Sequence, residues 1–77
     1  MKKLKLFYFD ECPYCQKVIG YMKENNIEVE MANIQTDQKN REELIEIGGK
    51  VQVPMLSIDG EALYESDDII EWFKNNI

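Results

Sequence analysis

The sequence predicts an α/β fold with the element order βαβαββα, in which a four-stranded mixed sheet is flanked by three helices. Apolar runs of strand type alternate with helical patterns along the 77 residues. Two strands joined through a helix are expected to be parallel with a right-handed crossover. Asp59-Gly60 separates two further β-type runs and is a strong signal for a two-residue antiparallel hairpin. A parallel pair and a hairpin together favour one mixed sheet.

The first strand and helix are predicted within residues 4–26. Residues 4–9 alternate and then become continuously apolar, which is typical of a strand that ends buried on both faces. The helix is expected to begin at Pro13, because proline suits the first helical position, with Cys12 as N-cap at the exposed end. Asn25-Asn26 ends it. Its core stripe is expected to comprise Val18, Ile19 and Met22.

A second strand and helix follow in the middle of the chain. Residues 27–34 alternate between apolar and acidic side chains, which suits an edge strand. The helix is predicted from Asp37 or Asn40 to Ile47, with Asn40 and Glu43 as a capping box. Gly48-Gly49 is expected to stop it.

The last part of the chain predicts the hairpin and a third helix. The hairpin strands are expected at residues 53–58 and 62–64. Ser66 is the expected N-cap of the helix, with Asp67 and Asp68 in the first turn near the positive end of the helix dipole. The side chains expected to bury this helix are Ile69, Ile70, Trp72 and Phe73.

Length and composition restrict the class of protein. No linker divides the chain, so we expect a single domain over residues 1–77. Neither a signal-peptide pattern nor an apolar run long enough to cross a bilayer is present, so we expect a cytoplasmic protein with no membrane partner. The net charge is −6, with no cluster of Lys or Arg, which argues against nucleic acid. The absence of histidine excludes a Cys-His nucleophile pair and any zinc site that needs imidazole.

Cys12-Pro13-Tyr14-Cys15 lies where the first strand gives way to a helix. In the cytosol, a lone cysteine pair is more often catalytic or metal-binding than structural. Cys12 at the helix start can accept N–H bonds and lies at the positive end of the dipole, so it is the expected nucleophile; the half-buried Cys15 is the expected resolving thiol. Asp10-Glu11 opposes a thiolate there. A catalytic Cys12-Cys15 dithiol is the favoured interpretation, without metal. Half of a zinc site shared across a dimer and an inert pair remain the alternatives.

Three segments of the sequence resemble the glutaredoxins, a branch of the thioredoxin fold. Cys12-Pro13-Tyr14-Cys15 is the dithiol signature of that family. Val53-Pro54 resembles the segment whose proline is cis and faces the active site. Ser66-Asp67-Asp68 resembles the residues that open the last helix. Arg41 to Leu44 and Gly49-Lys50 also fit bacterial members.

This resemblance implies glutathione-linked thiol–disulfide exchange on disulfide-containing or glutathionylated proteins, by a monomer whose redox-active disulfide is Cys12-Cys15. Val53, followed by Pro54, would pair its backbone with the cysteinyl part of glutathione. Ser66 and Asp67 would hold the γ-glutamyl end, where a carboxylate meets free N–H groups at a helix start. Lys50 or Arg41 would meet the glycyl carboxylate. Tyr14 would line the groove.

The sequence departs from the glutaredoxin pattern at two places. Phe9-Asp10-Glu11 stands where many members carry a lysine, and Tyr64-Glu65 stands where most have Gly-Gly. Glu65-Ser66 instead resembles the Glu-Ser pair with which glutathione transferase N-terminal domains hold the γ-glutamyl group. Two other functions remain open. One is a glutathione-independent redoxin, reduced by a thioredoxin-type reductase and donating electrons to a reductase; the other is an iron–sulfur carrier.

Overall fold

The structure is a computed structural model that describes residues 3–77, and it confirms the predicted element order. The four strands are β1 (Leu4–Tyr8), β2 (Glu30–Asn33), β3 (Met55–Ile58) and β4 (Glu61–Leu63). The three helices are α1 (Pro13–Glu24), α2 (Gln38–Gly48) and α3 (Ser66–Asn76). Within residues 3–77, no helix has the length and apolar character needed to cross a membrane.

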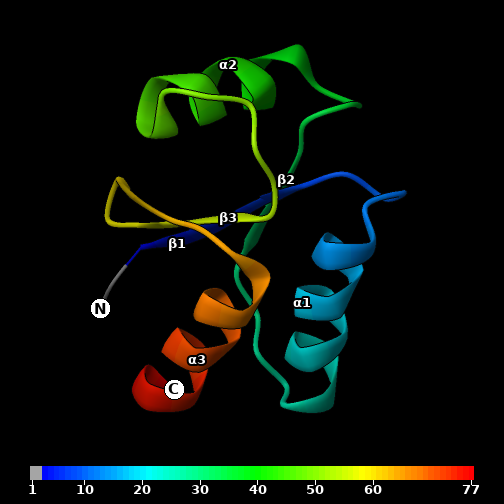
Figure 1. Ribbon diagram of the computed structural model, residues 1–77, viewed down its shortest axis with the longest axis vertical. Coiled ribbons are helices and arrows are strands. Elements are labelled where there is room, and N and C mark those ends of the chain that lie inside the picture. The colour runs from blue at the N-terminus through cyan, green and yellow to red at the C-terminus, as the bar shows by residue number, and fades with distance from the viewer. Residues whose placement is uncertain (1–2) are drawn as a thin grey trace.

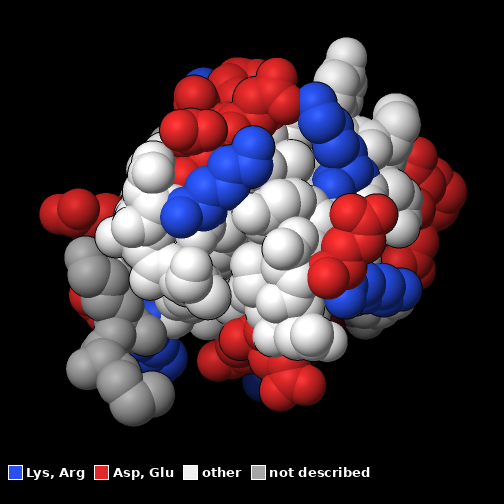
Figure 2. Space-filling model, turned by 90° about the horizontal axis from the view of Figure 1, so that it is seen from below, with Lys and Arg blue, Asp and Glu red and all other residues white. Residues whose placement is uncertain are grey.

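The strands form one mixed sheet in the order β2-β1-β3-β4. Strand β1 pairs in parallel with β2 and antiparallel with β3, and β3 pairs antiparallel with β4. Asp59 and Gly60 connect the hairpin with φ values of 52° and 89°, as its turn requires. Helix α2 covers one face of the sheet, while α1 and α3 lie together on the other (Figure 1). Seen from the α1 and α3 side, acidic and basic side chains border an uncharged centre (Figure 2).

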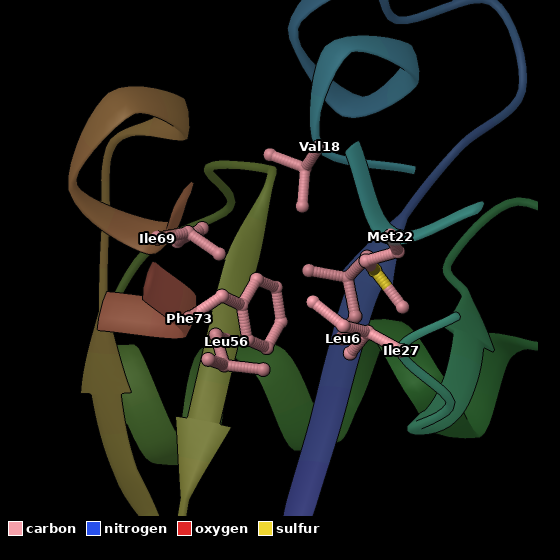
Figure 3. Packing of buried hydrophobic residues seen from close by; sticks show 7 residues of the cluster. All are labelled: Leu6, Val18, Met22, Ile27, Leu56, Ile69 and Phe73. Atoms are coloured by element: carbon pink, nitrogen blue, oxygen red, sulfur yellow. The ribbon is translucent and has the colours of Figure 1, made fainter. Parts of the chain in front are cut away.

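The first of two cores lies between the sheet and the α1–α3 pair. Side chains from the two central strands meet side chains from both helices there (Figure 3). Leu6 of β1 is fully buried in this core, and Phe7 is fully buried on the opposite face, as expected for a central strand. The buried members of this core are Leu6, Val18, Met22, Ile27, Leu56, Ile69 and Phe73.

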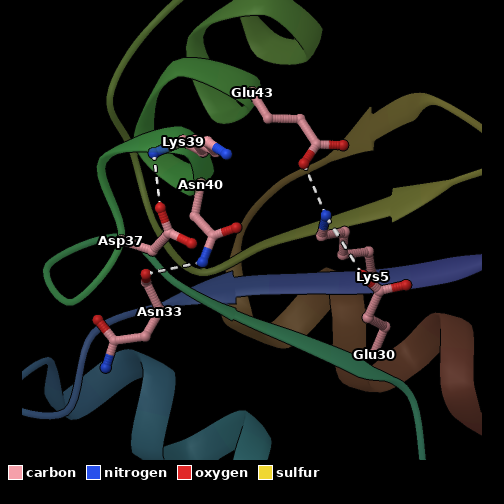
Figure 4. Close-up of polar contacts among 7 residues, drawn as sticks. All are labelled: Lys5, Glu30, Asn33, Asp37, Lys39, Asn40 and Glu43. Atoms are coloured by element: carbon pink, nitrogen blue, oxygen red, sulfur yellow. Dashed lines mark hydrogen bonds and ion pairs between the residues drawn. The ribbon is translucent and has the colours of Figure 1, made fainter.

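The second core lies between the sheet and α2, and a polar contact at its border holds the helix. The buried members are Phe7, Ala32, Ile34, Leu44 and Met55. Lys5 of β1 donates to Glu43 of α2 at 2.6 Å and lies 3.3 Å from Glu30 of β2 (Figure 4). The hydrogen bond to Glu43 raises the pKa of Lys5. Lys5 therefore links β1 to α2 and to β2 through ion pairs.

The predicted capping box of α2 is wrong. Asp37 is the N-cap, and its carboxylate accepts from the N–H of Lys39 at 2.9 Å (Figure 4). Asn40 instead donates to the carbonyl of Asn33 at 3.0 Å, and Glu43 binds Lys5. The predicted stop is confirmed: Gly49 is the C-cap, with a left-handed φ of 76°.

Other element boundaries also differ from the prediction: β1 ends one residue earlier, β3 begins two residues later, and β4 lies one residue earlier in the chain. Strand β2 lies at a sheet edge as expected, but it is shorter than the predicted residues 27–34. Helix α3 begins at Ser66 rather than after it, so Ser66 is not the N-cap. Glu65 takes that position with a φ of 24°, and its side chain makes no capping bond. The N–H groups of the first turn of α3 therefore have no side-chain cap.

Candidate functional site

The two cysteines lie at the start of α1, at the end of a short connection from β1. Cys12 is the N-cap with an extended backbone, and Pro13 occupies the first helical position, as predicted. The N–H of Cys12 donates to the carbonyl of Phe9 at 3.3 Å, which turns the chain from the strand into the helix. The Sγ of Cys12 accepts from the backbone N–H of Cys15 at 3.3 Å. The helix start therefore directs a donor at the Cys12 sulfur.

Burial distinguishes the two thiols less than the sequence suggested. Cys15 is fully buried, whereas the sequence predicted half burial for it. Cys12 is 6% exposed, so the expectation that it hangs from an exposed helix end is wrong. Both cysteines are free thiols, so the structure represents the reduced pair.

The environment of Cys15 disfavours its thiolate. Burial raises the pKa of Cys15 to about 12, with a further contribution from its hydrogen bond with Cys12. A backbone hydrogen bond from Phe9 acts in the opposite direction but does not compensate. Cys15 is therefore a neutral thiol at physiological pH, which fits a residue that does not make the first attack on a disulfide.

A groove of about 370 Å³ opens between the start of α1 and the start of α3. Seven residues from three segments line it: Tyr14, Gln52, Val53, Pro54, Glu65, Ser66 and Asp67. Tyr14 is 64% exposed and lies between the two cysteines in the sequence. The groove thus begins beside the dithiol motif.

The fold builds the groove from two short segments that are not helical or extended. Val53-Pro54 is a cis peptide bond immediately before β3, as the resemblance implied. Val53 precedes Met55, the first residue of β3 that pairs with β1, so its backbone lies outside that ladder. On the other side, Glu65 turns the chain into α3. The amide of Gln52 donates to the carboxylate of Glu65 at 3.0 Å and so connects the two walls.

The structure brings together five of the predicted glutathione contacts and leaves two candidates elsewhere. The five that line the groove are Tyr14, Val53, Pro54, Ser66 and Asp67. Lys50 does not line it; its Nζ lies 4.8 Å from the centroid of the Tyr64 ring. Arg41 lies in α2, on the other face of the sheet. A cation for a glycyl carboxylate therefore remains a prediction.

Sequence reasoning missed two residues at the groove. Gln52 directly precedes Val53-Pro54, and that position was the available signal. Lys17 lies one turn after Tyr14 on α1, and its Nζ forms a hydrogen-bonded ion pair with the Oδ1 of Asp67. Only the folded chain shows this pair, because 50 residues separate its members.

Tyr64 directly precedes Glu65 of the groove wall, and its ring packs against Gly48 at the end of α2. A Cβ on Gly48 would lie 1.9 Å from the Tyr64 hydroxyl oxygen, so glycine at position 48 leaves room for the ring. Within residues 3–77, the buried Tyr64 hydroxyl has no hydrogen-bond partner. The end of α2 and the approach to α3 are therefore closely packed.

Across residues 3–77, no group of three or more Cys, Asp or Glu side chains is arranged to hold a metal ion. The reactive groups of the site are two thiols beside a polar groove.

Comparison with known proteins identifies the family. Residues 6–76 match the family model described as the glutathione S-transferase N-terminal domain. The chain is 33% identical over 73 residues to an uncharacterized glutaredoxin-like 8.6 kDa protein in the rubredoxin operon of Clostridium pasteurianum, covering 88% of this chain and 97% of that protein.

Solved structures support the same assignment. The thioredoxin-like protein BC3987 superposes with a TM-score of 0.79 at 25% identity, covering 97% of this chain and all 100% of that one. Glutaredoxin 2 of Salmonella typhimurium, solved in complex with glutathione, gives a TM-score of 0.78 at 33% identity. That match covers 94% of this chain but only 33% of the other. The chain therefore belongs to the glutathione S-transferase N-terminal domain family, as a glutaredoxin-like protein with the thioredoxin fold.

Proposed function

We propose that this protein is a glutathione-linked thiol–disulfide oxidoreductase that reduces protein disulfides and glutathione mixed disulfides through Cys12 and Cys15. The observation that supports this most directly is the hydrogen bond from the Cys15 N–H to the Cys12 Sγ, at the head of a groove lined by Val53-Pro54 and the start of α3. An N–H directed at sulfur stabilises a thiolate more than a thiol. Cys12 is therefore the attacking residue.

On a glutathionylated protein, the Cys12 thiolate attacks the glutathione sulfur. A bond forms between Cys12 and glutathione, the protein–glutathione disulfide breaks, and the protein thiolate leaves and takes up a proton. A second glutathione, as thiolate, then attacks the mixed disulfide. Oxidised glutathione leaves and the Cys12 thiolate is restored. This cycle uses one thiol of the pair.

On a protein disulfide, the second thiol is required. Cys12 attacks one sulfur and forms a mixed disulfide with the substrate. Cys15 then loses its proton, attacks the Cys12 sulfur and releases the reduced substrate, which leaves a Cys12–Cys15 disulfide. Two glutathione molecules reduce that disulfide and leave as oxidised glutathione. Because the pKa of Cys15 is raised to about 12, transfer of its proton to the departing substrate thiolate belongs to this step.

The groove offers matching partners for glutathione. The backbone of Val53 lies outside the β1–β3 ladder and is available to an extended cysteinyl segment. The first helical backbone bond at the start of α3 runs from the N–H of Ile69 to the carbonyl of Glu65, at 3.0 Å. The N–H groups before Ile69 have no partner inside the helix and suit a carboxylate, and Asp67 suits an ammonium group.

The test is turnover coupled to glutathione reductase, with a glutathionylated peptide as substrate. We expect steady turnover in which glutathione is the only reductant. Asp67→Asn should raise the KM for glutathione about two- to fivefold. Asp68→Asn, which removes the same charge from a neighbour outside the groove lining, should not. Turnover only with a thioredoxin-type reductase would identify a glutathione-independent redoxin. A coloured dimer without turnover, after iron reconstitution, would identify a cluster carrier.

A further inference from the structure

We propose that Lys17 is a specificity-determining residue that makes the groove selective for thiols whose end group carries an ammonium and a carboxylate on one carbon. The inference rests on the proposed function, because it concerns the same groove. It adds a second residue of α1, after Tyr14, to a site built from Val53-Pro54 and the start of α3. Lys17 supplies a positive charge next to the carboxylate of Asp67.

The geometry places this charge at the edge of the groove. Helices α1 and α3 lie side by side on the same face of the sheet (Figure 1). Tyr14 and Lys17 are three positions apart on α1 and so share one helix face. Tyr14 lines the groove, as does Asp67, to which the Nζ of Lys17 is hydrogen-bonded. The ammonium group of Lys17 therefore lies beside the wall where an amino-acid end group would bind.

Both members of the pair remain open to a ligand. The side chains of Lys17 and Asp67 are 52% and 78% exposed. Lys17 is bonded to Oδ1 of the carboxylate, so Oδ2 can accept from the ammonium of a ligand. The ammonium of Lys17 has three donors and uses one of them for Asp67, so others can reach a carboxylate one carbon away from the bound ammonium. Lys17 and Asp67 together thus present the opposite charge pattern to an α-amino acid.

The charge of the surroundings explains why Lys17 is needed. The groove wall carries the carboxylates of Glu65 and Asp67, and Asp68 follows directly. Glu65 is bonded to the neutral amide of Gln52, so its charge is not balanced by that partner. Without Lys17, these carboxylates would oppose the attraction of the free N–H groups of α3 for a ligand carboxylate, and the wall would also attract cationic thiols that have no carboxylate. The charge of Lys17 attracts the ligand carboxylate and weakens the attraction of the wall for cationic thiols.

The experiment compares two lysine variants with two reductants. Lys17→Gln removes the charge at the groove. Lys23→Gln removes the same charge from the last turn of α1, away from the groove lining. The reductants are glutathione and 4-aminobutyryl-cysteinyl-glycine, which keeps the ammonium of glutathione but lacks its α-carboxylate. KM and kcat are measured for each combination at low and high salt, with a glutathionylated peptide held saturating.

We expect Lys17→Gln to raise the KM for glutathione about two- to fivefold, as the loss of one exposed ion pair would. The KM for the decarboxylated analogue should stay the same or fall, and kcat should not change. The effect should diminish at high salt. Lys23→Gln should behave like the unmodified protein.

Two outcomes overturn the inference while leaving the proposed function intact. One is that Lys17→Gln changes neither KM although Asp67→Asn raises the KM for glutathione. The other is that Lys17→Gln changes the KM values for glutathione and for the analogue equally. That result would show a general disturbance of the groove and no selectivity for the α-carboxylate. Absence of turnover with glutathione in the unmodified protein would instead contradict the proposed function, and this inference with it.

Discussion

The backbone N–H of Cys15 donates a hydrogen bond to the Sγ of Cys12 at 3.3 Å, and the side chain of Cys15 is itself fully buried. Cys15 thus donates a hydrogen bond to the sulfur of Cys12 through its backbone, while its own sulfur remains protonated. This arrangement supports the proposal that two chemically identical side chains have different roles in the reaction. Each role can be tested separately.

Substitution of each cysteine should separate the two activities. Cys15→Ser should retain removal of glutathione from a glutathionylated peptide, because that cycle needs one thiol, and should lose reduction of a protein disulfide. Cys12→Ser should lose both. Both assays use glutathione with its reductase, and mass spectrometry should find glutathione bound to Cys12 in the Cys15→Ser protein. If Cys15→Ser abolished both activities, Cys15 would be the nucleophile.

Alkylation should show the raised pKa of Cys15. A pKa of about 12 leaves almost no Cys15 thiolate at pH 8, and full burial adds a steric barrier. Iodoacetamide at pH 8 should therefore modify the folded, reduced protein at Cys12 only, and the unfolded protein at both positions. Peptide mapping of the adducts gives the result. Equal labelling of both cysteines in the folded protein would contradict the assignment.

Stability should fall at alkaline pH because of Cys15. Its pKa is about 12 in the folded state and about 8.5 in an unfolded chain, so the folded state retains a proton that the unfolded state releases between these values. The contribution is complete below pH of about 8.5 and is lost as the pH rises towards 12. Urea unfolding between pH 8 and 11 should show a steeper loss in the unmodified protein than in Cys15→Ala. Equal slopes would mean that Cys15 titrates normally when folded.

Gly48→Ala should destabilise the protein by about 1–3 kcal/mol, because the new Cβ would overlap the Tyr64 hydroxyl. Tyr64→Phe should recover part of the loss, since it removes the atom that the new Cβ meets. Gly20→Ala is the matched control: nothing lies within 4 Å of its Cβ position inside α1, so it should stabilise by about 0.5–1 kcal/mol. Thermal unfolding measures all four proteins. If Gly48→Ala and Gly20→Ala changed the stability equally, the Tyr64 ring would be free to move away from the new Cβ.

The ion pairs of Lys5 should contribute unequally. A double-mutant cycle with Lys5→Met and Glu43→Gln should give a coupling of about 0.5–1 kcal/mol, reduced in 1 M salt. The same cycle with Glu30→Gln should give less, because the Lys5–Glu30 distance is 3.3 Å rather than 2.6 Å and Glu30 is the more exposed partner. Urea unfolding gives the free energies. A larger coupling to Glu30 would contradict the importance of Lys5 in holding α2.

Local signals made most of the fold predictable from the sequence. Pro13 after a buried strand located the start of α1, and Asp59-Gly60 located the hairpin. The capping box of α2 was mispredicted because Asn40 binds the carbonyl of Asn33 on a neighbouring element, although Asp37 was one of the two expected starts of the helix. Such a contact depends on the packing of the helix against the sheet.

The candidate site was predictable from the sequence only in part. The dithiol motif and Val53-Pro54 have short, specific patterns that a reader of the sequence can recognise. Gln52 and Lys17 have none, because their partners Glu65 and Asp67 lie 13 and 50 residues further along the chain. The burial of Cys12 could not be predicted from helical periodicity, because Cys12 is the N-cap and lies outside the helix proper.

The position of β2 at the sheet edge has a consequence for self-association. An open edge offers unpaired backbone groups that can template pairing with another chain and lead to aggregation. Strand β2 has only four residues, and the outward alternation that begins at Glu28 continues to Glu30, whose carboxylate is held near Lys5. A second copy that approached this edge would bring like charges together. These acidic side chains thus oppose polymerisation along the exposed edge of β2.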